Sequence, residues 1–402
     1  MRRVAITGLG IISALGSTVP EFWSNLTSNV SGIAPITLVD PTRLRFQNGA
    51  EVKNFDPTQH FQSSQQAVMD RFAQFALVAA RQAITDSRLD FTSDLKSRTA
   101  IVTGSCIGGQ AAQDDQFVEL YRNSRDRVHP FTIPRTMANS GASHISMEYG
   151  ITGPVLTVST ACSSANHAIG QAFWMVRSGQ VDAAVAGGSE SPFSYGLLKA
   201  WESLRVVSPD TCRPFSKNRS GMILGEGGAM LVLEPLDAAR SRGAKVYGEI
   251  VGFGMSSDAF NVMAPSADGA AASMTRALQD AELTADSIGY INAHGTGTLA
   301  NDPTETRAIH LAFGAHANNL PISSTKSMHG HGLGAAGAIE AIATVLALQE
   351  GLLPPTANFS EPDPECDLDY IPNEPRRQRV EFALSNSFAF GGLNAVLAFR
   401  AV

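Results

Sequence analysis

Strand-like and helix-like segments alternate along the whole chain of 402 residues. Short apolar runs predict strands, and apolar residues spaced three and four apart predict helices. The predicted strands are Val4–Thr7, Ala100–Thr103, Val155–Ser159, Ala183–Ala186, Met230–Leu233, Val246–Gly252, Ile288–Asn292, Pro321–Ser323, Ala383–Ser385 and Val396–Phe399. The predicted helices are Arg71–Ser87, Ser163–Ser178, Gly269–Ala281, Pro303–Phe313 and Ala335–Glu350. This alternation favours an α/β fold with largely buried sheets.

The composition is typical of a globular protein rather than a membrane or nucleic-acid-binding protein. No run of about 18 apolar residues is found, so we expect no membrane segment. Gly8 and Gly10 interrupt the apolar start, which argues against a signal peptide. The four cysteines have no metal-ligand spacing, and the formal net charge of −7 comes without a basic stripe. We therefore expect a cytoplasmic protein that holds no metal and binds no nucleic acid.

Cys162 stands between a predicted strand and a predicted helix. The apolar run Val155–Cys162 leads directly into Ser163–Ser178, and Gly179 follows as a helix stop. A thiol at a helix N-terminus feels unpaired N–H groups and the positive end of the helix dipole, both of which favour the thiolate. Taken alone, a cysteine among small residues is more often buried and inert. The position nevertheless makes Cys162 a candidate nucleophile.

Two histidines follow later predicted elements. His294 lies in YINAHGTGT, at the end of a strand, and His331 lies in a Gly-rich stretch that opens an Ala-rich helix. Many loop histidines are only solvated, so neither is decisive by itself. Together with Cys162 they form a Cys/His/His set in which each side chain comes from the end of an element. That combination indicates an active site.

Four sequence blocks carry a resemblance to a known family. They are TACSSANH (Thr160–His167), NAHGTGT (Asn292–Thr298), SSTKSMHGHGLGAAGA (Ser323–Ala338) and NSFAFGGLNA (Asn386–Ala395). These blocks resemble the signatures of elongating β-ketoacyl-acyl-carrier-protein synthases, condensing enzymes of the thiolase superfamily. The resemblance runs from Val4 to Arg400 and is closest to specialised, nodulation-type ketosynthases. It implies a five-layer αβαβα sandwich of two similar halves, with residues 1–250 carrying the nucleophile and residues 251–402 carrying the histidines.

The resemblance implies a decarboxylative Claisen condensation. Cys162 would hold the acyl chain as a thioester, and malonyl-carrier would lose CO₂ and extend that chain to a 3-ketoacyl product, in fatty-acid or specialised polyketide or polyene synthesis. Backbone N–H groups of Cys162 and Phe390 would form the oxyanion hole, and neutral His294 and His331 would stabilise the enolate. No cofactor is expected, because phosphopantetheine arrives on the acyl carrier protein.

Supporting roles are implied for several more residues. Lys326 is expected to pair with Glu305, and Thr296 and Thr298 are expected to bind the phosphopantetheine arm. Asp302 is expected to be the N-cap before Pro303. The residues expected at the acyl pocket and its gate are Phe390, Ile107, Cys106 and Thr132.

The sequence departs from the family pattern at the gate and on the expected carrier surface. Ala389 and Leu393 flank the gate where Gly and Thr are usual, which predicts an altered acyl pocket. The stretch QSSQQAVMD, residues 62–70, has no Lys or Arg where the family carries a basic cluster. Arg205 remains as an expected carrier contact. We expect a dedicated, less acidic carrier or a second subunit over this face.

Alternative functions remain open at this point. A homodimer through the strand Ala183–Ala186 is expected, and a heterodimer with a paralogue is compatible with the same sequence. A noncatalytic subunit resembling a chain-length factor would lack the nucleophile, which is present here. A degradative thiolase would use a second catalytic cysteine near the C-terminus, where this chain has none.

Overall fold

The computed structural model describes residues 1–402, and its strands and helices alternate as the sequence predicts. The strands are β1 (Val4–Ser13), β2 (Ala34–Pro35), β3 (Asn48–Gly49), β4 (Thr99–Gly104), β5 (Val155–Val158), β6 (Ala183–Glu190), β7 (Gly227–Pro235), β8 (Gly248–Ser257), β9 (Ile288–Asn292), β10 (Ile322–Ser323), β11 (Leu352–Leu353), β12 (Arg376–Arg377), β13 (Phe382–Ala389) and β14 (Leu393–Arg400). The helices are α1 (Val19–Thr27), α2 (Ser63–Val68), α3 (Arg71–Ser87), α4 (Ser93–Ser97), α5 (Gln110–Phe117), α6 (Thr132–Thr136), α7 (Ser140–Tyr149), α8 (Ser164–Ser178), α9 (Tyr195–Leu204), α10 (Leu236–Ser241), α11 (Ala267–Asp280), α12 (Asn301–Phe313), α13 (Lys326–His329) and α14 (Ala336–Glu350).

The two halves of the chain have the same sheet topology. The large sheet runs β10-β9-β13-β14-β8-β1-β7-β6-β4-β5. When the five strands of each half are numbered in chain order, both halves read 3-2-4-5-1 from the outer edge to the centre. The halves meet where β1 pairs antiparallel with β8, over Val4–Ile6 and Gly248–Ile250. The expectation of two similar halves is therefore confirmed, and the boundary expected near Val251 falls inside β8.

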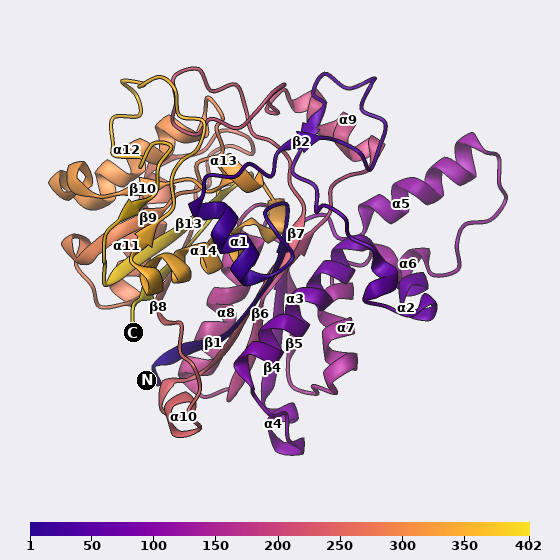
Figure 1. Cartoon of the computed structure of the whole chain (residues 1–402), viewed down its shortest axis with the longest axis horizontal. Coiled ribbons are helices and arrows are strands. Elements are labelled where there is room, and N and C mark those ends of the chain that lie inside the picture. The colour runs from indigo at the N-terminus through magenta and orange to yellow at the C-terminus, as the bar shows by residue number, and fades with distance from the viewer.

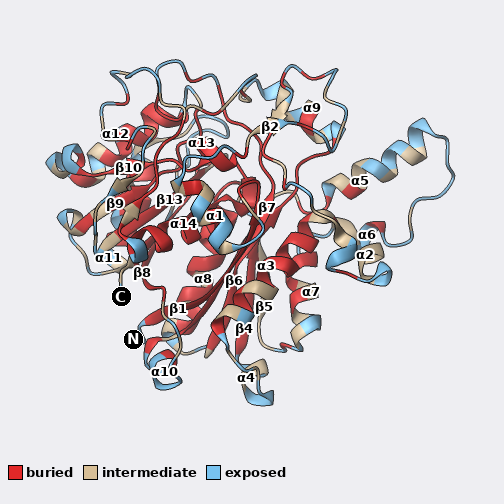
Figure 2. Ribbon diagram, in the orientation of Figure 1, coloured by how far each residue is buried: buried red, intermediate tan, exposed pale blue.

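Helices form three layers around the two half-sheets (Figure 1). Helices α3 and α7 cover the outer face of the first half, and α11 and α12 cover the outer face of the second. Helices α8 and α14 lie between the halves, inside a core cluster of 44 buried residues. Figure 2 shows this middle layer as almost wholly buried. The arrangement is the five-layer αβαβα sandwich that the resemblance implied.

Helix α14 corrects the expectation that no segment could span a membrane. The window Leu333–Glu350 is long and apolar enough to cross one by composition, yet 89% of it is buried inside the fold. Its apolar surface packs against both half-sheets rather than facing outward. A central core helix contacts protein on all sides, so it needs no polar face.

Candidate active site

Cys162 sits on a strained turn between β5 and α8. Ala161, directly before it, has φ of +51°, a left-handed conformation that is costly for a residue with a side chain. The turn sends the chain straight from the strand into α8, so that Cys162 lies at the N-terminal end of this helix. Ser163 Oγ donates to the carbonyl of Leu393 at 2.9 Å and ties this turn to the hairpin between β13 and β14. Strain of this kind is common at functional sites.

The two histidines reach Cys162 from the second half of the chain. His294 follows β9, and His331 follows β10 and α13. The thiol and the nearest imidazole nitrogens of both histidines lie within 4.8 Å of one another, and His331 Nε2 is 3.1 Å from Cys162 Sγ. The Cys/His/His set predicted from sequence is thus one cluster. Its donors would also suit a soft metal ion, so the absence of a metal stays a prediction.

Hydrogen bonds fix the tautomer of each imidazole. Leu333 N–H donates to His331 Nδ1 at 3.3 Å, so the ring proton of neutral His331 is on Nε2. Lys326 Nζ lies 3.4 Å from His294 Nδ1, and an ammonium can only donate, so the ring proton of His294 is also on Nε2. Burial, reinforced by the Lys326 charge, lowers the pKa of both rings well below the usual value. Both histidines are therefore neutral donors aimed at the space beside the thiol.

Lys326 is paired with Glu340, so the expected ion pair with Glu305 is wrong. Lys326 Nζ bonds to Glu340 Oε1, and both side chains are fully buried. Glu340 lies on α14, 14 residues further along the chain. Burial raises its pKa to about 7, and the Lys326 charge opposes this rise. The sequence held a signal for this pair, since a carboxylate in the middle of an Ala-rich core helix must find a cation.

Glu305 instead holds the backbone of the histidine loop. Its carboxylate accepts the N–H groups of His294 at 2.8 Å and Gly295 at 2.7 Å. The Asp302 carboxylate accepts the N–H group of Gly297 at 3.1 Å. The expectation that Asp302 is the N-cap is wrong, because α12 already begins at Asn301. Two buried carboxylates thus fix the loop that presents His294.

Burial outweighs the helix N-terminus at Cys162. The sequence predicted a lowered thiol pKa, but removal from water raises the pKa of Cys162 to about 11, against the opposing effects of the Lys326 charge and a backbone N–H group. Burial leaves a thiolate in this site poorly solvated, which favours the neutral thiol at rest. The Nε2–H of His331 can donate to the sulfur as negative charge develops there.

Alkylation of Cys162 should therefore show no low thiol pKa. We expect the rate constant for iodoacetamide to rise about tenfold per pH unit from about pH 7 to about pH 10, because the thiolate fraction rises tenfold per unit below the pKa. The rate is measured by mass spectrometry, with Cys162→Ala to subtract the other three cysteines. A plateau below about pH 8 would show that the helix N-terminus dominates after all.

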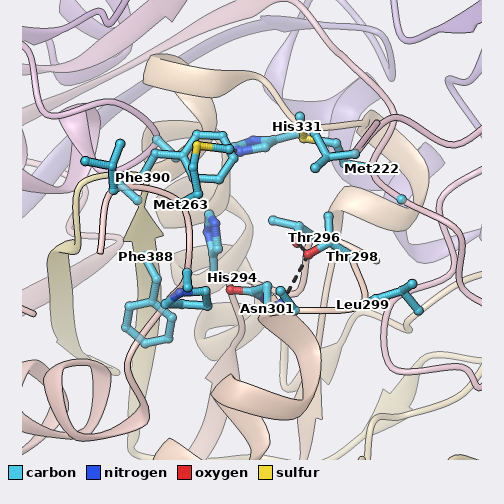
Figure 3. A pocket seen from close by; sticks show the side chains of 18 of the residues that line it. Met222, Met263, His294, Thr296, Thr298, Leu299, Asn301, His331, Phe388 and Phe390 are labelled. Atoms are coloured by element: carbon cyan, nitrogen blue, oxygen red, sulfur yellow. Dashed lines mark hydrogen bonds between the residues drawn. The ribbon is translucent and has the colours of Figure 1, made fainter. Parts of the chain in front are cut away.

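A cavity of about 310 Å³ opens over the cluster. Thr296 and Thr298 line it, with their hydroxyls 2.9 Å apart, and their contact with the phosphopantetheine arm stays a prediction. Figure 3 shows His294, His331 and Phe390 around the same space. Lining residues that the sequence reasoning missed are Trp201, Met222, Val262, Met263, Leu299, Asn301 and Phe388. Phe388 lies inside the block Asn386–Ala395, but the pattern gave no sign that it faces the cavity, and the others come from segments outside the four blocks.

The expected gate is a tight turn at the edge of this cavity. Phe390, Gly391 and Gly392 connect β13 to β14, and both glycines have positive φ, of 82° and 69°. The Phe390 ring stacks on Trp201 with centroids 6.3 Å apart. The N–H groups of Cys162 and Phe390, expected as oxyanion donors, make no hydrogen bond to another residue and are free to bind a ligand.

Other predicted residues lie outside the cavity. Cys106 and Ile107 pack against a separate apolar cluster that includes Leu198 and Leu333. Thr132 lies on α6, where its hydroxyl donates to the carbonyl of His129. Their contact with substrate stays a prediction.

Arg205, the expected carrier contact, does line the cavity and lies at the end of α9.

Two further titratable side chains are buried. His329, three residues after Lys326, hydrogen-bonds to Thr325 Oγ1 at 2.9 Å. Cys366, the cysteine nearest the C-terminus, packs in the outer core of the second half and does not line the cavity. All four cysteines are unpaired thiols.

Comparisons with known proteins agree with this site. The chain matches the family descriptions "Beta-ketoacyl synthase, N-terminal domain" over residues 1–239 and "Beta-ketoacyl synthase, C-terminal domain" over residues 247–360. It is 47% identical to nodulation protein E of Rhizobium sp. (strain N33), with 100% of both chains covered. It is 44% identical to 3-oxoacyl-[acyl-carrier-protein] synthase 2 of Synechocystis sp. (strain ATCC 27184 / PCC 6803 / Kazusa), covering 99% of this chain and 98% of that one.

A solved structure gives the same result for the fold. The ishigamide ketosynthase/chain length factor superimposes with a TM-score of 0.95 at 37% identity, covering 100% of this chain and 99% of the other. Similarity over the whole length of both halves leaves no segment of the chain unaccounted for. The chain belongs to the β-ketoacyl synthase family, whose members are condensing acyltransferases that make 3-oxoacyl-carrier-protein thioesters.

Proposed function

We propose that Cys162 is the nucleophile of the first half-reaction. Its sulfur attacks the carbonyl carbon of an acyl thioester, the carbon bonds to Cys162 Sγ, and the carrier's phosphopantetheine thiol leaves with the proton that the Cys162 thiol gives up. The negatively charged oxygen of the tetrahedral intermediate would accept hydrogen bonds from the N–H groups of Cys162 and Phe390, which donate to no other residue. One such donor contributes about 10²–10³-fold in rate.

The second half-reaction uses the two histidines as hydrogen-bond donors. A malonyl thioester loses CO₂, and the electron pair of the broken bond becomes the enolate of an acetyl thioester. The enolate carbon then attacks the acyl-Cys162 carbonyl and expels the Cys162 sulfur, giving a 3-ketoacyl thioester two carbons longer. The enolate oxygen would accept the Nε2–H groups of His294 and His331. The observation that carries this proposal is that both imidazoles are neutral, hold their ring proton on Nε2 and lie in one cluster with the thiol.

Product formation by the isolated chain tests this function. We expect the purified protein, given acyl- and malonyl-loaded carrier protein, to release CO₂ and form the 3-ketoacyl product. A noncatalytic subunit would form none. Activity that appears only when a paralogue is added would favour a heterodimer of the ketosynthase and chain-length-factor kind.

An apolar arm provides the proposed subunit contact, because the strand expected at the seam, β6, lies inside the sheet between β7 and β4 and is buried along its length. Helix α5 and the loop after it project from the body of the chain (Figure 1). Exposed on this arm and α6 are Phe117, Val118, Tyr121, Val128, Phe131, Ile133 and Met137. Apolar patches of this kind mark protein interfaces. We infer that a second subunit covers the arm, as a homodimer or a heterodimer, and sedimentation of the purified chain tests this. The four unpaired thiols fit a cytoplasmic enzyme.

The acyl pocket is proposed to accept chains other than ordinary long saturated ones. Ala389 lines the cavity beside Phe390, and its Cβ limits the backbone freedom that glycine would give the gate. Trp201 stacks on the gate ring, so moving Phe390 also means breaking this contact. A panel of acyl chains tests the proposal, and a plain preference for long saturated chains would contradict it.

A further inference from the structure

Three exposed apolar side chains line the mouth of the active-site cavity, and two more are next to lining residues in the chain. We call them the mouth rim: Leu204, Phe260, Val262, Met263 and Leu299, which are 42%, 74%, 71%, 43% and 69% exposed. Val262, Met263 and Leu299 line the cavity itself. Leu204 and Phe260 are the chain neighbours of the lining residues Arg205 and Asn261. Single exposed apolar residues are ordinary, but five gathered at one opening indicate a binding surface.

The rim is connected directly to the gate. Gly391 N–H, next to Phe390, donates to the carbonyl of Val262 at 2.8 Å. Asp258, at the start of the same rim loop, accepts a hydrogen bond on Oδ1 from Asn394 Nδ2 on β14, at 2.7 Å. Figure 3 shows Met263 beside Phe390, and Leu299 at the far side of the opening. A protein bound to the rim would therefore contact the loop that is hydrogen-bonded to the gate turn.

The lining of the cavity beneath the rim carries little charge. Among the 23 residues lining the cavity, Arg205 is the only Lys, Arg, Asp or Glu. It forms no ion pair within the chain. Residues 62–70 add no cation. A surface of this composition offers an incoming protein apolar contact and one positive charge, and long-range attraction is weak.

We propose that the mouth rim is the docking surface for the acyl carrier protein, which binds mainly by apolar contact with Arg205 as the single charge contact. This rests on the proposed function, since only a carrier must bring a phosphopantetheine arm to this mouth. The carrier that fits presents an apolar patch beside its phosphopantetheine serine and one carboxylate facing Arg205. Binding of this kind is nearly independent of salt, because apolar burial does not depend on ionic screening.

Loading of Cys162 from two matched donors tests the proposal on the full-length protein. The donors are octanoyl-loaded fatty-acid-type acyl carrier protein and octanoyl-pantetheine, which share the acyl group and arm but not the protein. Loading is followed by intact mass. We expect Phe260→Ser and Leu299→Ser each to lower the rate of loading from the carrier by about tenfold or more, as at buried interface positions. Phe260→Ser should leave loading from octanoyl-pantetheine unchanged. Leu311→Ser, at another exposed apolar position on α12, is the matched control.

The dependence of the loading rate on salt concentration is a second test of the proposal. Between about 0.05 M and about 0.5 M NaCl, we expect the rate of loading from the carrier to change by less than about twofold. A fall of about tenfold that is abolished by Arg205→Gln, with no effect of Phe260→Ser, would overturn the proposal in favour of charge-driven docking. Normal loading from both donors by both rim variants would assign the rim to another subunit. Failure of octanoyl-pantetheine to load the wild-type protein would instead contradict the function of Cys162.

Discussion

Condensation by a His294→Ala variant is expected to fall by about 10²–10³-fold, while acyl transfer to Cys162 falls by less than tenfold. The reason is geometric. His294 offers its Nε2–H to the cavity but makes no hydrogen bond to the Cys162 thiol, whereas His331 Nε2 lies 3.1 Å from Cys162 Sγ. Loss of His294 should therefore remove one donor to the malonyl enolate and leave the first half-reaction nearly intact. Single-turnover loading and CO₂ release, measured separately, give the two rates.

His331→Ala is the matched control for this split. It removes a donor to the enolate and also the hydrogen bond to the thiol, so both half-reactions should slow. Equal losses in both half-reactions for His294→Ala would show that His294 acts on the thiol or on the fold of the site. Equal and small losses for both variants would contradict the role of the imidazoles as enolate donors.

Breaking the buried pair at Glu340 is expected to destabilise the fold by about 3–5 kcal/mol. A Glu340→Leu variant leaves the fully buried Lys326 ammonium without its carboxylate, and the cost of that unpaired charge exceeds the gain from the added apolar side chain. Denaturant unfolding measures the change as a lower midpoint. The same variant should also displace Lys326 from His294 and slow condensation.

The double variant Lys326→Met/Glu340→Leu separates the effect of the unpaired charge on stability from the effect of losing the Lys326 ammonium on condensation. Replacing both partners by apolar residues removes the unpaired charge, so much of the lost stability should return. Condensation should stay slow, because His294 Nδ1 no longer has the ammonium that fixes its tautomer. A Glu340→Leu variant as stable as the wild type would contradict the cost assigned to breaking the buried pair.

The fold was predictable because its local signals agree with its tertiary structure. The pattern over Arg71–Ser87 gave α3 with its observed ends, since Asp70 caps the N-terminus through Phe72 N–H and the apolar spacing matches the buried face. The layering came from the resemblance, and the order of the strands in the sheet was not predicted. Local patterns say nothing about which strands become neighbours when connections cross the sheet.

The sequence predicted which residues form the site, but not which of them pair or how burial changes the thiol pKa. Cys162, His294 and His331 each end an element and lie together. The partner of Lys326 was predicted wrongly, because Glu305 stands near His294 in sequence while Glu340 reaches the ammonium from the core helix α14. The thiol pKa was predicted in the wrong direction, since the sequence shows the helix N-terminus but not the burial that outweighs it.

The mouth rim had no signature in the sequence. Phe260 and Leu299 look like ordinary loop residues, and their meaning comes only from lying around one opening. Apolar residues are expected inside a fold, so a sequence pattern cannot tell which ones remain exposed.

Intact-mass spectrometry of the protein after incubation with acyl-loaded carrier proteins tests the central claim most directly. The account predicts a mass gain equal to one acyl group on the wild type, lost on treatment with hydroxylamine, and no gain on Cys162→Ala. The chain that loads best then identifies the substrate. An equal gain on Cys162→Ala, or no gain from any donor while Cys162 is still open to alkylation, would contradict the assignment of Cys162 as the nucleophile.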